Sequence, residues 1–115
     1  MTRDGLAALL GEQTTACGPA RDALHAGGAF TVWDGPVPAH RLAHIYRSRL
    51  RRTRKRGQPT LALAATVDLL EQAGEELLRI GRIDAPDTPW TFLLFLDAAA
   101  TTVVACTGVA PRENS

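Results

Sequence analysis

The chain has 115 residues, a length that fits one domain with one hydrophobic core. Hydrophobic residues make up 45% and charged residues 22% of it, and these ordinary globular values exclude a largely disordered chain. No apolar run reaches the roughly 18 residues that a membrane-spanning helix needs, and the N-terminal apolar patch is too short for a signal peptide. We therefore expect a cytoplasmic protein with no membrane partner, one domain over residues 1–110 and a frayed tail over 111–115.

The net charge of +1 hides a very uneven distribution of charge. Gly35 to Val67 contains eight basic residues and no acidic one, whereas the rest of the chain has twelve acidic and five basic residues. Seven of the thirteen basic residues lie between residues 47 and 57. A chain with charges segregated in this way is expected to present one strongly positive surface.

The first third of the chain predicts two short helices and a strand. Residues 3–11 place three leucines on one side of a helix. Pro19 suits the first turn of a second short helix, and the pair Gly27 and Gly28 ends it. The run "AFTVW", residues 29–33, is β-branched and aromatic and predicts a strand. The sequence "DGPVP" then breaks the chain.

The centre of the chain predicts a long helical hairpin. In residues 39–56 the apolar positions recur at spacings of three and four and form one stripe, which comprises Leu42, Ile45, Tyr46, Leu50 and Thr53. Gly57 is a natural C-terminal cap for this helix. A second helix is expected over residues 60–80, with an apolar seam at Leu63, Val67, Leu70, Gly74 and Leu77 and an acidic polar side.

The last third predicts a hairpin of two strands, "WTFLLFL" and "TTVVACTGV", joined by "DAAA". The expected fold class is α+β: a two-layer domain with the order helix, helix, strand, helix, helix, strand, strand, in which a small sheet containing the antiparallel hairpin packs on the long helical hairpin. A winged helix has a similar order. Its reading helix should be exposed and basic, however, whereas the second long helix here is apolar and acidic.

The candidate binding site is the basic helix over residues 41–56. Clustered arginine and lysine side chains neutralise phosphates and release counterions, so they bind nucleic-acid backbone with little sequence preference. The site comprises Arg41, Arg47, Arg51, Arg52, Arg54, Lys55 and Arg56. The hypothesis is a small non-enzymatic intracellular protein that binds nucleic acid and has a regulatory role. Because Tyr46 is the only ring in the run and lies on the apolar side, a stacking platform for single strands is not expected.

Three alternatives to nucleic acid remain open for the basic helix. It could belong to a protein-interaction module, of the immunity or accessory type, that binds an acidic partner. It could belong to an enzyme or binder that acts on a phosphorylated small molecule, since arginine also forms bidentate contacts with phosphate. Finally, it could be only the solvated face of a helix.

No cofactor, metal or catalytic residue is assigned from the sequence. His40 and His44 have a spacing that zinc accepts on a helix, but no second spaced pair completes a ligand set. Cys17 lies in a polar loop and has no motif around it. Cys106 lies among valine and alanine, which favours a small, buried, reduced core residue.

A homodimer is expected from the distribution of apolar residues. The helix over 60–80 carries more apolar surface than a three-stranded sheet readily covers, and the hairpin strands are apolar on both faces. The alternative is a monomer in which residues 3–27, the two N-terminal helices, cover the far side of the sheet.

Overall fold

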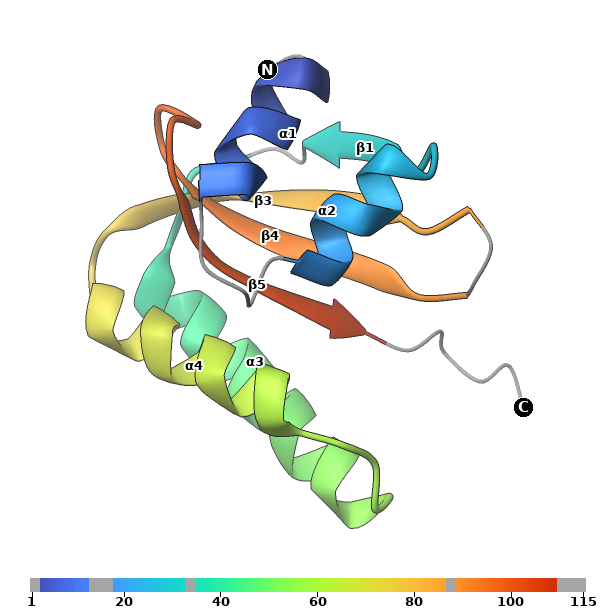
Figure 1. Cartoon of the computed structure of the whole chain (residues 1–115). Helices are drawn as coiled ribbons and strands as arrows, with labels where there is room; N and C mark the ends of the chain where they lie inside the picture. Colours follow the sequence, from blue (N-terminus) through green and yellow to red (C-terminus); the bar gives the residue numbers. More distant parts are fainter. Residues whose placement is uncertain (1–2, 13–17, 33–34, 87–88, 110–115) are drawn as a thin grey trace.

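The computed structural model describes residues 3–12, 18–32, 35–86 and 89–109 (Figure 1). The described part contains the helices α1 (Arg3–Glu12), α2 (Gly18–His25), α3 (Ala39–Lys55) and α4 (Leu61–Ala73), and the strands β1 (Ala29–Val32), β2 (Val37–Pro38), β3 (Leu77–Asp84), β4 (Thr91–Asp97) and β5 (Val103–Val109). The expected α+β fold class is confirmed. Two expectations, the frayed tail over 111–115 and the polar loop at Cys17, concern residues outside the described ranges.

The sheet is antiparallel throughout and has the order β1-β3-β4-β5, with β2 also paired to β3. Strand β3 is therefore the central strand, since it pairs with β1 through Phe30 and Ile83 and with β4 through Ile80 and Phe95. The hairpin predicted around "DAAA" is present between β4 and β5, and Ala100 N donates to Asp97 O at 2.9 Å in its turn.

The prediction of a helix over residues 60–80 is wrong in its last third. Helix α4 ends at Ala73, and Leu77–Asp84 forms the central strand β3. Gly74, which the apolar seam included, has a φ of 59° and directs the chain out of the helix. The apolar residues after Gly74 fit the period of a helix as well as that of a strand. Hydrogen bonding to β1 on one side and β4 on the other favours the strand. A second strand was also missed, because Val37–Pro38 was assigned to a chain break.

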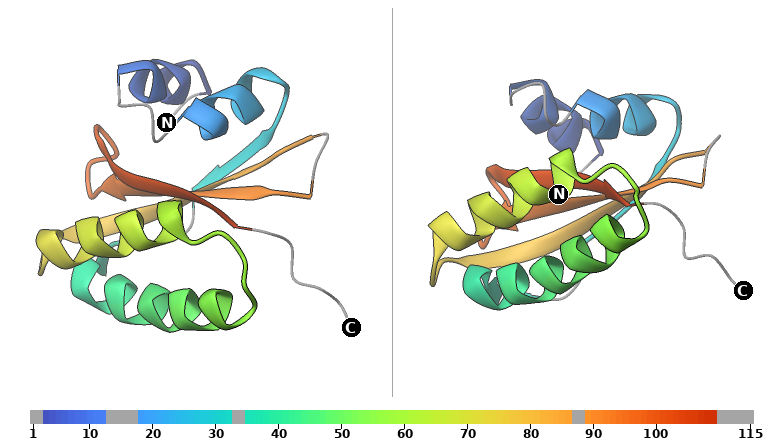
Figure 2. Two further views of the ribbon diagram at one scale, coloured as in Figure 1. Left: turned by 60° about the horizontal axis from the view of Figure 1, so that its bottom comes forward. Right: turned by 90° about the horizontal axis from the view of Figure 1, so that it is seen from below.

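Helices cover both faces of the sheet, so the molecule has three layers where the sequence analysis expected two (Figure 2). Helices α1 and α2 pack on one face through a cluster that includes Leu6, Leu24 and Leu94. Helices α3 and α4 pack on the other through a cluster that includes Leu70 and Phe95. The far side of the sheet is thus covered by the N-terminal helices, as in the monomeric alternative.

Helix α3 is fixed to the rest of the fold along its inner side and at its start. The ring of Tyr46 meets that of Phe95 in β4 edge to face, with centroids 5.3 Å apart and an interplanar angle of 83°. At its start, Ala39 N donates to Glu76 O and His40 N donates to Gly74 O, both at 2.8 Å. The turn between α4 and β3 therefore holds the first turn of α3 in place.

Candidate functional site

All seven basic side chains that the sequence analysis selected are exposed, and they belong to α3 or to its C-terminal end. They are Arg41, Arg47, Arg51, Arg52, Arg54, Lys55 and Arg56, and they are called the basic cluster below. Helix α3 has 17 residues and is therefore about 25 Å long. One strand of B-DNA carries a phosphate for each 3.4 Å of its axis, so a helix of this length spans about seven phosphates.

Three members of the basic cluster line a shallow depression on the outer face of α3. The depression has a volume of about 460 Å³, and its walls are His44, Ile45, Ser48, Arg51, Arg52 and Lys55. These positions follow one another at helical spacing, so they form one continuous strip on the side opposite the buried residues. All the walls come from a single helix, which makes the depression a contact surface and not an enclosed pocket.

Ile45 was expected in the apolar stripe but is 51% exposed and lines this depression. It precedes Tyr46 by one residue and therefore lies about 100° away from it around the helix. The sequence predicted an inner position for Ile45 only because it lies three residues after Leu42, an interval typical of one helix face. His44 and Ser48 were likewise not selected as site residues, and they join the basic side chains here because they share the outward direction.

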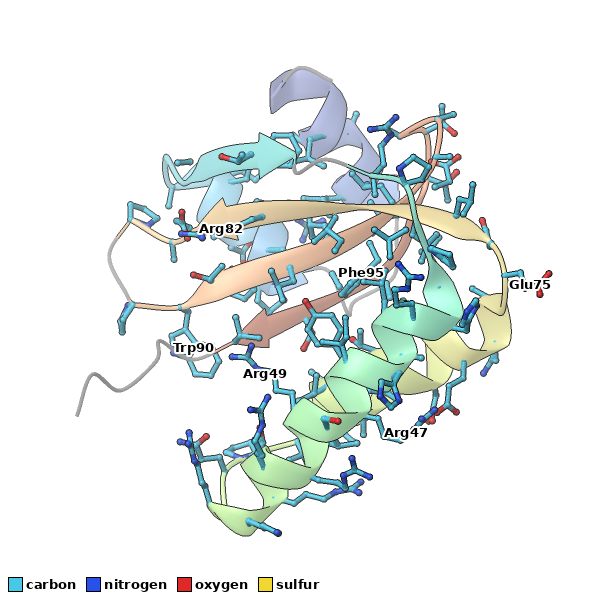
Figure 3. The ribbon with its side chains drawn as sticks, turned by 180° about the vertical axis from the view of Figure 1, so that it is seen from behind. Arg47, Arg49, Glu75, Arg82, Trp90 and Phe95 are labelled. Carbon is cyan, nitrogen blue, oxygen red and sulfur yellow. The ribbon has the colours of Figure 1, made fainter. Side chains whose placement is uncertain are left out.

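Arg47 differs from the rest of the basic cluster because it is bound within the molecule. It forms an ion pair with Glu71 of α4, and Arg47 Nε donates to Glu71 Oε1 at 3.0 Å. Both side chains are close to half exposed, so the pair contributes at most about 1 kcal/mol to stability. Its structural consequence is that Arg47 points along the α3–α4 contact, away from the outer face of α3 (Figure 3).

The other six members have no ion-pair partner within the described part of the chain, whose ion pairs are Arg47–Glu71 and Arg82–Asp84. Arg51 donates to the neutral Ser48 Oγ at 3.2 Å, which leaves its charge uncompensated. Arg49 was left out of the site and is half-buried beside Tyr46. Burial raises the pKa of the Tyr46 hydroxyl, and the positive charge of Arg49 partly opposes that rise.

Two backbone amides at the N-terminus of α3 are already occupied by partners within the protein. Helix N-termini bind phosphate through free amide groups. The amides of Ala39 and His40 already donate to backbone carbonyl oxygens of the α4–β3 turn. At the other end, Arg52, Arg54 and Lys55 lie in the last turn, where cations complement the helix dipole. Neither of those two amides is therefore free for an anion, whereas the basic side chains of the last turn are exposed.

His40, His44 and Cys106 are not brought together. The two histidines are exposed on α3, whereas Cys106 is buried in the cluster on the opposite face of the sheet. Within the residues that the structure describes, no group of three or more histidine, cysteine or acidic side chains could hold a metal ion. In the same residues, no helix combines the length and apolar character needed to cross a membrane.

Comparison of the chain with protein-family models, curated proteins and solved structures finds no match.

Proposed function

We propose that the protein binds the sugar–phosphate backbone of nucleic acid through the outer face of α3, as a non-enzymatic, regulatory binding protein of the cytoplasm. The observation that supports this most directly is a group of six exposed cations, on α3 and at its C-terminal cap, that form no ion pair within the described ranges of the chain. Each cation that meets a phosphate releases condensed counterions, which is the main source of non-specific affinity for nucleic acid.

The composition of α3 favours contacts to phosphates over contacts to bases. The helix contains no asparagine or glutamine, the side chains that pair in a bidentate manner with adenine. Arginine can read guanine, but here every arginine of the helix except Arg41 lies in its C-terminal half, from Arg47 onward, and not at the N-terminal end that usually reads bases. We expect little preference between duplex sequences.

The shape of the surface disfavours a phosphorylated small molecule. Pockets for small ligands usually enclose most of the ligand surface. The α3 depression has all its walls on one helix, so a small ligand there would stay largely in solvent. An extended polyanion, by contrast, can follow the helix and meet cations along its length.

The proposal is tested with two unrelated 20-base-pair duplexes and a triple variant, Arg51→Glu with Arg52→Glu and Arg54→Glu. The variant should lose at least about tenfold in affinity for both duplexes alike, because it reverses three phosphate-binding charges. Arg21→Glu is the control, since Arg21 lies on α2 across the sheet. It should change affinity far less.

A change in preference between the two duplexes without a loss of overall affinity would contradict backbone binding. Binding to polyglutamate but not to either duplex would assign the basic cluster to an acidic protein partner instead. Thermal unfolding of each variant shows whether the fold is kept, so that a loss of binding can be interpreted.

A further inference from the structure

Helix α4 carries an apolar strip that the described part of the fold leaves uncovered. Leu61 is 87% exposed and Leu69 is 41% exposed. Ala62 and Ala65 are also exposed. Leu61, Ala65 and Leu69 follow one another at intervals of four, so they lie along one side of the helix. These four residues are called the α4 strip.

The α4 strip faces away from α3. Glu71 marks the side of α4 that meets α3, because it pairs with Arg47. Leu69 lies two residues before Glu71 and hence about 160° away from it around the helix. The inner side of α4, with Leu63 and Leu70, is buried in the core and is a separate surface.

The helical pair formed by α3 and α4 has unlike charges at its two ends. The end at the α3–α4 connection carries Arg54 and Arg56, both exposed, which lie at the end of α3 and precede Leu61, the first residue of α4. The opposite end carries Glu75 and Glu76, which are exposed in the turn after α4, and these two carboxylates outnumber the one exposed arginine there, Arg41 in the adjoining first turn of α3. Figure 3 shows Glu75 at this end, far from the α3–α4 connection. A second copy in antiparallel orientation would therefore bring each basic end to an acidic end.

We propose that the α4 strip is an interface between two copies of this chain, related by a two-fold axis and with the two α4 helices antiparallel. In this arrangement Leu61 of each copy packs beside Leu69 of the other, and Ala65 lies near the axis, where its small side chain allows a close approach. A two-fold contact is self-complementary in shape and, here, in charge. A parallel pair would place like charges together. The proposal does not depend on nucleic-acid binding.

The size of the strip predicts a weak dimer. A stable interface usually buries about 800 Å² on each partner, and two leucines with two alanines provide less than that. The expected dimer therefore forms in the range of tens of micromolar and dissociates on dilution. Because charged ends contribute to the contact, added salt should weaken it.

Sedimentation velocity from 5 to 500 µM in low salt tests the interface. The 12.3 kDa wild-type chain should show a weight-average mass that rises towards twice that value. Leu61→Gln removes an exposed apolar side chain and should keep the protein monomeric at least tenfold higher in concentration. Ile45→Gln is the matched control, because Ile45 is 51% exposed but lies on the outer face of α3, outside the strip and both charged ends. A wild-type mass that stays at 12.3 kDa overturns the proposal, and so does a Leu61→Gln variant that dimerises like wild type.

The antiparallel orientation is tested by a pair of charge-reversed variants. One carries Glu75→Lys with Glu76→Lys and is basic at both ends; the other carries Arg54→Glu with Arg56→Glu and is acidic at both ends. Each alone should be more monomeric than wild type, whereas an equimolar mixture should dimerise. A mixture that associates no better than its separate components overturns the antiparallel arrangement. Circular dichroism of each variant confirms that the fold is kept.

Discussion

Arg47 Nε donates to Glu71 Oε1 at 3.0 Å, and this contact joins the basic helix α3 to the acidic side of α4. It divides the basic cluster into one arginine whose charge is balanced within the protein and six cations that are not balanced by any described carboxylate. Arg47 was selected from the sequence on the same grounds as its neighbours. The structure shows that it is the member least available to an external anion.

Releasing Arg47 from Glu71 should strengthen binding to nucleic acid. In Glu71→Gln the partner loses its charge, and Arg47 becomes free to reach a phosphate. We expect the affinity for duplex DNA to rise about two- to fivefold and the slope of log K against log salt to become steeper by about 0.9. Fluorescence anisotropy at several salt concentrations measures both.

A comparison of two alanine variants provides the control for this prediction. Arg47→Ala should reduce the affinity less than Arg52→Ala does. Of these two arginines, Arg52 lies on the outer face of α3, whereas Arg47 is paired with Glu71. Equal losses for the two variants would mean that Arg47 leaves Glu71 and contacts the nucleic acid in the complex.

Two backbone carbonyl groups lie so close to Gly28 that a side chain does not fit there. Gly28→Ala should therefore destabilise the protein. A Cβ atom at this position would lie 2.7 Å from both Ala23 O and Asp84 O, and neither carbonyl can move without distorting α2 or β3. We expect a loss of about 1–3 kcal/mol in the free energy of unfolding, measured by denaturant titration. Gly18→Ala is the control, since nothing lies within 4 Å of its added methyl group. Equal stability of the two variants would contradict the packing described here.

Asp97 stabilises the β4–β5 turn in a way that depends on pH. Its Oδ1 accepts from the backbone amides of Thr101 and Thr102 at 2.6 and 2.9 Å, and Oδ2 accepts from the Thr101 hydroxyl at 2.7 Å. These hydrogen bonds, that from the Thr101 side chain first, lower the pKa of Asp97 below its ordinary value of 3.8. The charged form is thus favoured by folding.

It follows that Asp97→Asn should be less stable than wild type at neutral pH. The contribution of Asp97 is complete above the unfolded-state pKa and is lost as the pH falls through the lower folded-state pKa. The difference in unfolding free energy between wild type and variant should therefore shrink as the pH is lowered from 6 to below 3. A difference that stays constant over this interval would show that the charge of Asp97 does not stabilise the turn.

The parts of the fold that the sequence predicts well are those whose signals are local. The basic helix begins at Ala39 and ends before Gly57, and the φ of 69° at Gly57 is the conformation expected of a capping glycine. The end of α4 was misplaced because Gly74 also fitted an apolar seam. Pairing of β3 with β4 on one side and with β1, which lies much earlier in the sequence, on the other distinguishes the two structures, and such pairing cannot be read from the spacing of apolar residues.

The residues of the candidate site could be predicted from the sequence, but the ion pair between Arg47 and Glu71 could not. The run of basic residues selects α3, and helical periodicity places most of its charges outside the core. The contact of Arg47 with Glu71 spans 24 residues and depends on how α4 packs beside α3, so the sequence alone gives no sign of it. The same holds for the N-terminal helices, whose position on the far face of the sheet follows from tertiary packing.

The salt dependence of duplex binding by the wild-type protein tests the central claim most directly. If the six members of the basic cluster that form no ion pair with a described residue contact phosphates, log K should fall linearly with log salt with a slope of up to about −5. The affinity should then decrease by up to about a thousandfold between 50 and 200 mM salt. No binding at 50 mM salt, or binding with no steep dependence on salt, would contradict the account.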